Sequence, residues 1–228
     1  MTGPVDRPAG PPAGGWGLDR RRLYLCTPDR PDLEAFLEAC IGGGVDVVQL
    51  RDKVLGDAAL VERARLAHRV CARHGVPFVL NDRPDLAVLA GADGVHVGQD
   101  DMSAAEARAV VGDGAIVGLS THAPAELAAA MESPAPVDYV SAGPVVPTPT
   151  KPGRAGTGPG YVSHAVAVSP WPVWVTGGAS PSTVPGLVAA GARHVVVVRW
   201  LTEASDPGAA ARALRDALDG ELAVAGGR

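Results

Sequence analysis

The sequence has few of the residues on which disulfide-stapled and zinc-binding proteins depend. Its 228 residues include 3 cysteines, Cys26, Cys40 and Cys71, which are odd in number and lack the CxxC spacing of zinc sites. We therefore expect neither a disulfide framework nor a zinc centre. A chain of this kind is typical of the reducing cytoplasm.

The sequence is also short of features that bind nucleic acids or membranes. Aromatic residues make up only 4% of the chain, the formal net charge is −5, and basic residues cluster only at 20–22. These values argue against a base-stacking or phosphate-tracking surface. Apolar runs stay well short of the ~20 residues that a membrane helix needs. We expect no nucleic-acid partner and no membrane span.

The overall composition of the sequence predicts one folded domain with a short extension at each end. Residues 1–20 lack the basic-then-apolar order of a signal peptide, and their prolines and glycines predict a disordered arm. The hydrophobic fraction of 46% is ample for one large core. We place the folded domain at 21–220 and a flexible tail at 221–228.

Apolar segments recur eight times, and each is followed by a stretch with helical character. These segments are rich in valine and largely unbroken by polar residues until their last positions, which is typical of parallel strands covered on both faces. They span 23–27, 45–51, 77–82, 94–99, 115–121, 138–144, 172–178 and 194–200. Eight strand–helix units predict an α/β fold, the (β/α)8 or TIM barrel. A doubly wound open sheet is the alternative, but no GxGxxG follows the first strand.

In a (β/α)8 barrel the functional residues lie at the carboxyl ends of the strands. In QLRDK, the alternation of a strand puts Gln49 and Arg51 on one face, and Lys53 follows just beyond. An amide and two cations at one barrel mouth suit a phosphorylated ligand. The alternative is a solvated strand end whose cations pair with Asp52 or Asp57.

Acidic residues follow the next two strands. The third unit ends in Asn81 and Asp82, and the fourth runs on to Asp100 and Asp101. Because neighbouring strands lie ~4.8 Å apart, carboxylates at their ends can reach a common point. Acids beside a phosphate-seeking patch suggest Mg²⁺, although aspartate here also commonly caps a helix. We expect Asp100 to be a cap and Asp82 with Asp101 to bind Mg²⁺.

Two histidines and a serine also lie at these strands. His96 is inside its strand, where we expect a hydrogen-bonded core residue. His122 is better placed, but a lone histidine without an identified partner is weak support for acid–base catalysis. Ser120 has neither a GxSxG setting nor an evident base, so we do not expect a nucleophile there.

The loop after the sixth strand, 141–158, fits neither a helical nor a strand period. Its Thr148, Thr150 and Lys151 suit phosphate oxygens, and its glycines would permit the movement of a lid. The seventh unit carries Gly178 and the eighth carries Arg199, where this fold usually has its phosphate cradle. The strand ends therefore predict two anion sites and two phosphorylated substrates.

Six segments occur together at these strand ends: QLRDK (49–53), ND (81–82), GVHVGQDD (94–101), GLSTH (118–122), GPVVPTPTK (143–151) and GG (177–178). In this order they resemble the thiamine phosphate synthase (thiamine-phosphate pyrophosphorylase) family, over nearly everything after residue 20. The resemblance implies a (β/α)8 enzyme that joins 4-amino-5-hydroxymethyl-2-methylpyrimidine diphosphate to a thiazole phosphate, or to its carboxylated form. Thiamine phosphate and pyrophosphate would be released.

The resemblance also implies roles for residues that match the family's motifs. The pyrimidine diphosphate would be held by Gln49, Arg51, Lys53, Asn81, Ser120 and Lys151. Mg²⁺ would be bound by Asp82 and Asp101, and the thiazole phosphate by Thr148, Thr150, Gly178, Val198 and Arg199. Arg199 stands where the family often has serine. The implied mechanism is dissociative, with charge on the departing pyrophosphate stabilised electrostatically, and it requires no protein nucleophile.

Two other functions compete with this interpretation. A related thiazole tautomerase also carries a histidine like His122, but it has no need of the QLRDK, ND and TPTK segments. A catalytically silent phosphate-binding barrel would need the cradle after strands seven and eight, but not paired acids. The sequence leaves the oligomeric state open, and a homo-oligomer is compatible with it.

Overall fold

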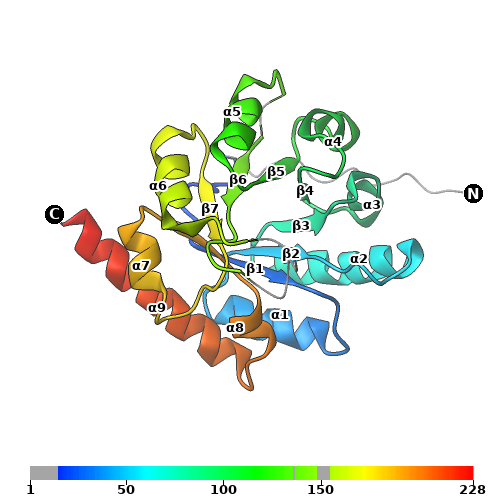
Figure 1. Cartoon of the computed structure of the whole chain (residues 1–228). Coiled ribbons are helices and arrows are strands. Elements are labelled where there is room, and N and C mark those ends of the chain that lie inside the picture. The colour runs from blue at the N-terminus through cyan, green and yellow to red at the C-terminus, as the bar shows by residue number, and fades with distance from the viewer. Residues whose placement is uncertain (1–14, 136, 148–154, 228) are drawn as a thin grey trace, which may run out of the picture.

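The computed structural model describes residues 15–135, 137–147 and 155–227, and within them eight parallel strands close into a barrel surrounded by helices (Figure 1). Each strand pairs with the next in chain order, and the eighth returns to the first. The (β/α)8 prediction is confirmed, and the open sheet is excluded.

The strands are short, mostly four residues, and almost wholly buried. They are β1 (Leu23–Thr27), β2 (Val47–Leu50), β3 (Phe78–Asn81), β4 (Gly94–Val97), β5 (Ile116–Thr121), β6 (Tyr139–Ala142), β7 (Val173–Thr176) and β8 (His194–Val197). The eighth ends earlier than predicted, because Val198 leaves the extended conformation (ψ −89°) and a short helix begins at Arg199.

The helices lie outside the barrel. They are α1 (Leu33–Gly42), α2 (Asp57–Arg73), α3 (Pro84–Ala90), α4 (Ala104–Val111), α5 (Pro124–Glu132), α6 (Gly158–Val168), α7 (Val184–Ala189), α8 (Arg199–Thr202) and α9 (Pro207–Gly226). The last continues beyond residue 220, the boundary that the sequence predicts for the domain. None of the helices in the described part of the chain is long and apolar enough to cross a bilayer.

Several helix starts follow from local sequence. Proline, whose fixed φ suits a first turn, opens α3, α5 and α9. The start of α4 is a capping box, in which the Ser103 side chain accepts from the Glu106 backbone N–H and Glu106 accepts from Ser103. The prediction that Asp100 caps this helix is therefore wrong.

Two apolar layers hold the barrel together. The larger one lies between the strands and the helices, and the smaller one fills the barrel interior. The interior layer consists of Leu18, Tyr24, Val47, Val79, Ile116, Tyr139 and Trp174. Inward-facing residues above this layer reach the carboxyl ends of the strands, which is where the site lies.

The opposite end of the barrel is covered by the segment just before β1. Leu18 is buried, and the Trp16 indole N–H donates to the Gly114 carbonyl at 3.1 Å. The Arg21 guanidinium donates to the carbonyls of Trp16, Asp46 and Gly75. Residues 15–20 thus pack on the barrel, although their composition predicts that they belong to the N-terminal arm.

Candidate active site

A cavity of about 940 Å³ opens at the carboxyl ends of the strands. All the predicted site residues that the structure describes line it: Gln49, Arg51, Lys53, Asn81, Asp82, Asp101, Ser120, Gly178, Val198 and Arg199. Thr148, Thr150 and Lys151 lie outside the described residues, as does part of the proposed lid. Side chains far apart in the sequence thus share one cavity, because the closed barrel brings all strand ends together.

The cations after β2 face the cavity and do not form the ion pairs of the alternative interpretation. Lys53 Nζ lies 2.9 Å from Asp82 Oδ2 across the neighbouring strand end. Asp52 instead accepts backbone N–H groups in its own turn, and Asp57 pairs with Arg83. The contact between Lys53 and Asp82 therefore joins the basic and acidic parts of the site.

Asp82 and Asp101 form a carboxylate pair in the cavity wall. Asp82 has a left-handed backbone (φ 63°), and its N–H donates to the His96 carbonyl at 2.8 Å. Burial raises the pKa of Asp82 above its usual range, and contact with the Asp101 carboxyl raises it further, whereas Lys53 opposes the shift. Asp82 does not cap α3, whose first flanking residue is Arg83.

The acidic pair fits a divalent cation bound through few protein ligands. Two adjacent carboxylates repel each other, so they favour an added positive charge between them. Among the described residues, no group of three or more His, Cys, Asp or Glu could hold a metal alone. Mg²⁺ commonly takes one or two carboxylates and completes its shell with water and phosphate oxygens. The donor set therefore suits Mg²⁺ delivered with a phosphorylated ligand.

A row of buried polar side chains forms the floor of the cavity. Gln49 Nε2 donates to the Tyr24 hydroxyl at 2.8 Å, and the Tyr24 and Tyr139 hydroxyls lie 2.9 Å apart. The two ring nitrogens of His96 lie 2.9 Å from the Tyr139 hydroxyl and from Ser120 Oγ. The expectation that His96 is a hydrogen-bonded core residue is confirmed.

Sequence reasoning does not identify the two tyrosines of this floor. Each stands in an apolar strand, where a lone aromatic residue indicates core packing. One signal is present for Tyr24, which shares strand parity with the cavity-facing Cys26. Tyr139 can be recognised as an interior residue only together with Gly118 on the neighbouring strand, because a Cβ on Gly118 would lie 2.1 Å from Tyr139 Cζ.

His122 has a partner that the sequence analysis does not identify. Its Nδ1 lies 2.9 Å from Glu126 Oε2, one helical turn further along the chain. The same carboxylate accepts from the His122 backbone N–H at 2.7 Å. This contact orients the imidazole at the cavity edge and joins β5 to α5.

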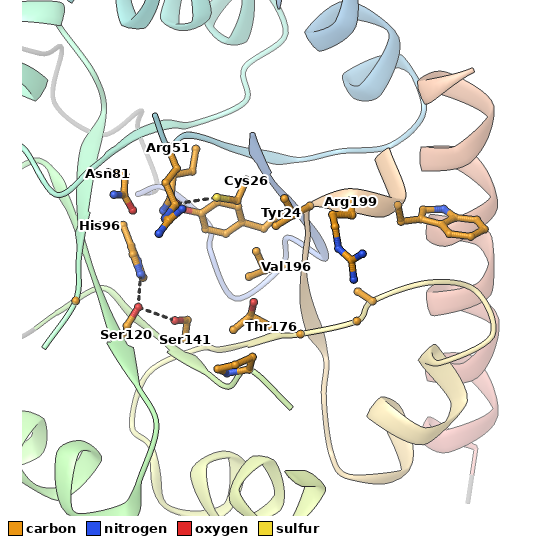
Figure 2. Close-up of a pocket in the computed structure, with 18 of the residues that line it drawn as sticks. Tyr24, Cys26, Arg51, Asn81, His96, Ser120, Ser141, Thr176, Val196 and Arg199 are labelled. Carbon is orange, nitrogen blue, oxygen red and sulfur yellow. Dashed lines mark hydrogen bonds between the residues drawn. The ribbon is translucent and has the colours of Figure 1, made fainter. Parts of the chain in front are cut away.

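The other side of the cavity is formed by the loops after β7 and β8. Gly177 and Gly178 both have positive φ (107° and 81°), and a Cβ on Gly177 would lie 2.5 Å from the Val145 nitrogen. The glycines thus let the loop after β7 pack closely against the loop after β6. Arg199 is the first residue of α8, not the end of a strand, and Figure 2 shows it across the cavity from His96 and Ser120.

Comparison with known proteins agrees with this arrangement. The model of the family "Thiamine monophosphate synthase" matches residues 23–201. The chain belongs to this family. A thiamine-phosphate synthase of Thermobifida fusca is 45% identical, with 88% of this chain and 94% of the relative covered. A thiamine-phosphate synthase of Thermus thermophilus is 48% identical, and the match covers 87% of this chain and 98% of the relative.

A solved structure supports the same assignment. The thiamine phosphate pyrophosphorylase of Pyrococcus furiosus has a TM-score of 0.80 and 25% identity, covering 90% of this chain and 98% of that one. Thiamine-phosphate synthase is therefore the activity of this chain, which makes it a transferase of thiamine biosynthesis. The tautomerase and the catalytically silent barrel are disfavoured accordingly.

Proposed function

We propose that the chain joins 4-amino-5-hydroxymethyl-2-methylpyrimidine diphosphate to a thiazole phosphate, or to its carboxylated form, with release of pyrophosphate. The observation that carries this proposal is that one cavity contains a carboxylate pair, several cations and a buried polar floor. The carboxylate pair, through a bound metal ion, and the cations suit a diphosphate. The polar floor suits a heteroaromatic ring, which needs hydrogen-bond partners.

The pyrimidine diphosphate would lie over the β2–β5 strand ends. The Gln49, Asn81 and Ser120 side chains, which are nearly buried, would bind its ring by hydrogen bonds. Arg51 and Lys53, which line the cavity, would bind the diphosphate, and Lys151 would join them. Their positive charges lower the energy of the departing pyrophosphate more than that of the intact ligand, which is the condition for catalysis.

Asp82 and Asp101 would hold Mg²⁺. When bound there, the ion supplies charge neutralisation at the diphosphate oxygens. Lys53, which contacts Asp82 at 2.9 Å, lies where it can move from the carboxylate to the diphosphate as the ligand enters.

The thiazole phosphate would lie on the opposite side, where Arg199 and the Gly178 backbone face the cavity. Thr148, Thr150 and Val198 complete the proposed set. The C–O bond to the diphosphate would break first and leave a cationic pyrimidine methylene, which the thiazole nitrogen would then attack. The bonding electrons leave with pyrophosphate, so no protein nucleophile is consumed. We also propose a cytoplasmic location, supported by three buried thiols.

The test is to mix purified protein with both substrates and Mg²⁺ and to follow pyrophosphate and thiamine phosphate together. We expect one pyrophosphate for each thiamine phosphate. Folded protein that forms neither product would overturn the proposal, and isomerisation of the thiazole alone would favour the tautomerase.

Arg199→Ser separates the two substrate sites. This variant should raise the KM for the thiazole phosphate and leave the KM for the pyrimidine diphosphate within about twofold, because the two sites lie on different sides of the cavity. An equal rise in both values would contradict the assignment of Arg199.

A further inference from the structure

The polar floor of the cavity is one continuous chain of hydrogen bonds that crosses the barrel interior. It connects β1, β2, β6, β4 and β5, and Figure 2 draws its bonds from His96 to Ser120 and from Ser120 to Ser141. Its members in order are Cys26, Gln49, Tyr24, Tyr139, His96, Ser120 and Ser141. The donor–acceptor distances along it run from 2.8 to 3.4 Å. Two of these residues, Gln49 and Ser120, belong to the proposed pyrimidine site.

Such a chain is costly to build in this place. Barrel interiors are usually filled by branched aliphatic side chains, and a buried hydroxyl or imidazole destabilises the fold unless it is hydrogen-bonded. Tyr24 and Tyr139 are 2% and 1% exposed, and His96 is 8% exposed. Trp174 packs edge-on against both tyrosines, with ring centroids 5.3 and 6.4 Å away. The packing holds each ring in one position.

The chain has a direction, which is set at its Gln49 end. Cys26 Sγ donates to Gln49 Oε1, and Gln49 Nε2 donates to the Tyr24 oxygen. This bond leaves the Tyr24 hydroxyl proton available for Tyr139, and the Tyr139 proton is then available for His96 Nδ1. With Nδ1 accepting, His96 carries its proton on Nε2 and donates to Ser120.

Ser120 is the point where this direction reaches the cavity. Its oxygen accepts from Ser141 Oγ at 3.4 Å, and in the direction set by Gln49 it also accepts from His96 Nε2 at 2.9 Å. A hydroxyl has two acceptor lone pairs and one donor proton. When both lone pairs accept hydrogen bonds from His96 and Ser141 in the cavity wall, the hydroxyl proton is left to donate toward the cavity.

We propose that Tyr24, Tyr139 and His96 are positioning residues that hold Ser120 as a hydrogen-bond donor toward the pyrimidine substrate. The site therefore selects a ring with an unprotonated sp² nitrogen at that point and disfavours a ring that presents N–H or C–H there. This inference rests on the proposed function for the identity of the ligand. In this proposal the three residues act only by orienting Ser120, and they do not contact the reacting atoms.

The two tyrosines of the floor keep their protons over the pH range of ordinary enzyme assays. Burial raises the pKa of the Tyr24 and Tyr139 phenols well above the usual value, so both stay protonated. A protonated phenol can always donate one hydrogen bond to the next residue of the hydrogen-bonded floor.

The first test reads the protonation of His96 directly and needs no activity. The protein is labelled with ¹⁵N at its 6 histidines, and His96→Asn identifies the His96 signals. We expect one protonated nitrogen, Nε2, in the ligand-free protein at neutral pH. Tyr139→Phe removes the donor to Nδ1 and should produce a mixture of tautomers. A proton on Nδ1 in the wild-type protein would overturn the proposal.

The second test is a double-mutant cycle on the KM for the pyrimidine diphosphate. Loss of one oriented hydrogen bond should raise this KM about tenfold in Tyr139→Phe, with a smaller change in kcat. In a Ser120→Ala background the same change should have almost no further effect, because the donor that it orients is already absent. Independent, multiplicative effects of the two changes would overturn the proposal.

Tyr161→Phe is the matched control. It removes the hydroxyl of the third tyrosine, which is also buried but lies on α6, away from the cavity lining. Its KM for the pyrimidine diphosphate should equal that of the wild type. The failures of the two proposals are distinguishable: absence of thiamine phosphate formation rejects the proposed function, whereas the wrong tautomer rejects the positioning chain.

Discussion

At the scale of single residues, Asp82 shows how chemistry and backbone geometry combine in this site. Its φ of 63° is uncommon for a residue with a side chain, although Asp and Asn tolerate it better than most. This conformation places its carboxylate in contact with Asp101 and Lys53. A strained residue between a cation and a second acid is typical of a functional position.

Asp101→Asn tests the acidic pair. The amide keeps the acceptor that Gly98 N–H uses at 2.8 Å but loses the charge that would hold Mg²⁺. Loss of several kcal/mol of electrostatic stabilisation predicts that turnover falls about 100-fold or more. Initial rates over a range of Mg²⁺ concentrations measure this effect.

Asp113→Asn, at an exposed acid in the loop after α4, is the control, and its turnover and Mg²⁺ dependence should equal those of the wild type. Circular dichroism checks that the fold of both variants is intact. Wild-type rates and metal dependence in Asp101→Asn would remove Asp101 from the site.

At the scale of strands, close packing between neighbours decides which residues fit inside the barrel. Gly118 on β5 lies opposite Tyr139 on β6, and the tyrosine ring occupies the volume that a Cβ at position 118 would need. Gly94 on β4 has the same relation to Ile116 on β5, whose carbonyl oxygen would lie 2.2 Å from an added Cβ. Small residues thus make room for the large interior side chains.

Gly118→Ala should destabilise the protein by at least about 1–3 kcal/mol, the usual cost of overpacking a core. A Cβ at 2.1 Å from Tyr139 Cζ forces the ring or the strand to move. Urea unfolding followed by fluorescence measures the free energy of unfolding.

Gly160→Ala in α6 is the matched control, because among the described residues beyond its chain neighbours and the adjacent helix backbone, nothing lies within 4 Å of the position that its Cβ would take. It should be neutral, or stabilising by up to about 1 kcal/mol, since alanine favours a helix. Equal stability of the two variants would show that the barrel interior absorbs the extra methyl group.

The fold and the position of the site are predictable from the sequence, because both depend on local patterns. Valine-rich segments define strands, and polar residues after them mark the carboxyl ends. The sequence alone therefore places Arg51, Asp82 and Asp101 together, and in the structure they line one cavity. The cap of α4 is not predictable in this way, because Asp100 and Ser103 both suit a cap and only geometry distinguishes them.

The hydrogen-bonded floor escapes prediction for a different reason. It depends on which residues of different strands lie opposite each other, and that register is a property of the closed barrel. Tyr24 on β1 meets Tyr139 on β6, 115 positions away, and no local pattern relates them. The end of β8 is also predicted too late, because HVVVVRW continues the apolar pattern past Val197.

At the scale of the whole molecule, a buried histidine links stability to pH at the end of the barrel opposite the cavity. His194 at the start of β8 donates from Nδ1 to the Arg21 carbonyl at 2.6 Å, and its ring lies against Trp174. Burial lowers the pKa of His194, and the nearby Arg22 and Arg193 lower it further. The neutral form is therefore the one that the fold accommodates.

This shift predicts that stability decreases as the pH falls below about 6.5, the usual pKa of an exposed histidine. In that range the unfolded chain binds a proton that the folded chain does not, so the free energy of unfolding rises with pH. The contribution is complete above about pH 6.5. Urea unfolding at several pH values between mildly acidic and neutral measures the slope.

His194→Gln provides the comparison, because glutamine can donate to the Arg21 carbonyl but does not titrate. The variant should show a smaller slope over the same pH range. Identical slopes in the two proteins would assign the pH dependence to other groups.

The pairing of β8 with β1, with Tyr24 opposite Val196, has a consequence for biosynthesis. A growing polypeptide that has not yet emerged past β8 lacks the strand that closes the ring, and it also lacks Arg199. Catalytic competence should therefore appear abruptly, once β8 and Arg199 are available, instead of accumulating unit by unit. Ribosome-stalled chains that stop before His194 would carry most of the ligand-binding groups and still be inert.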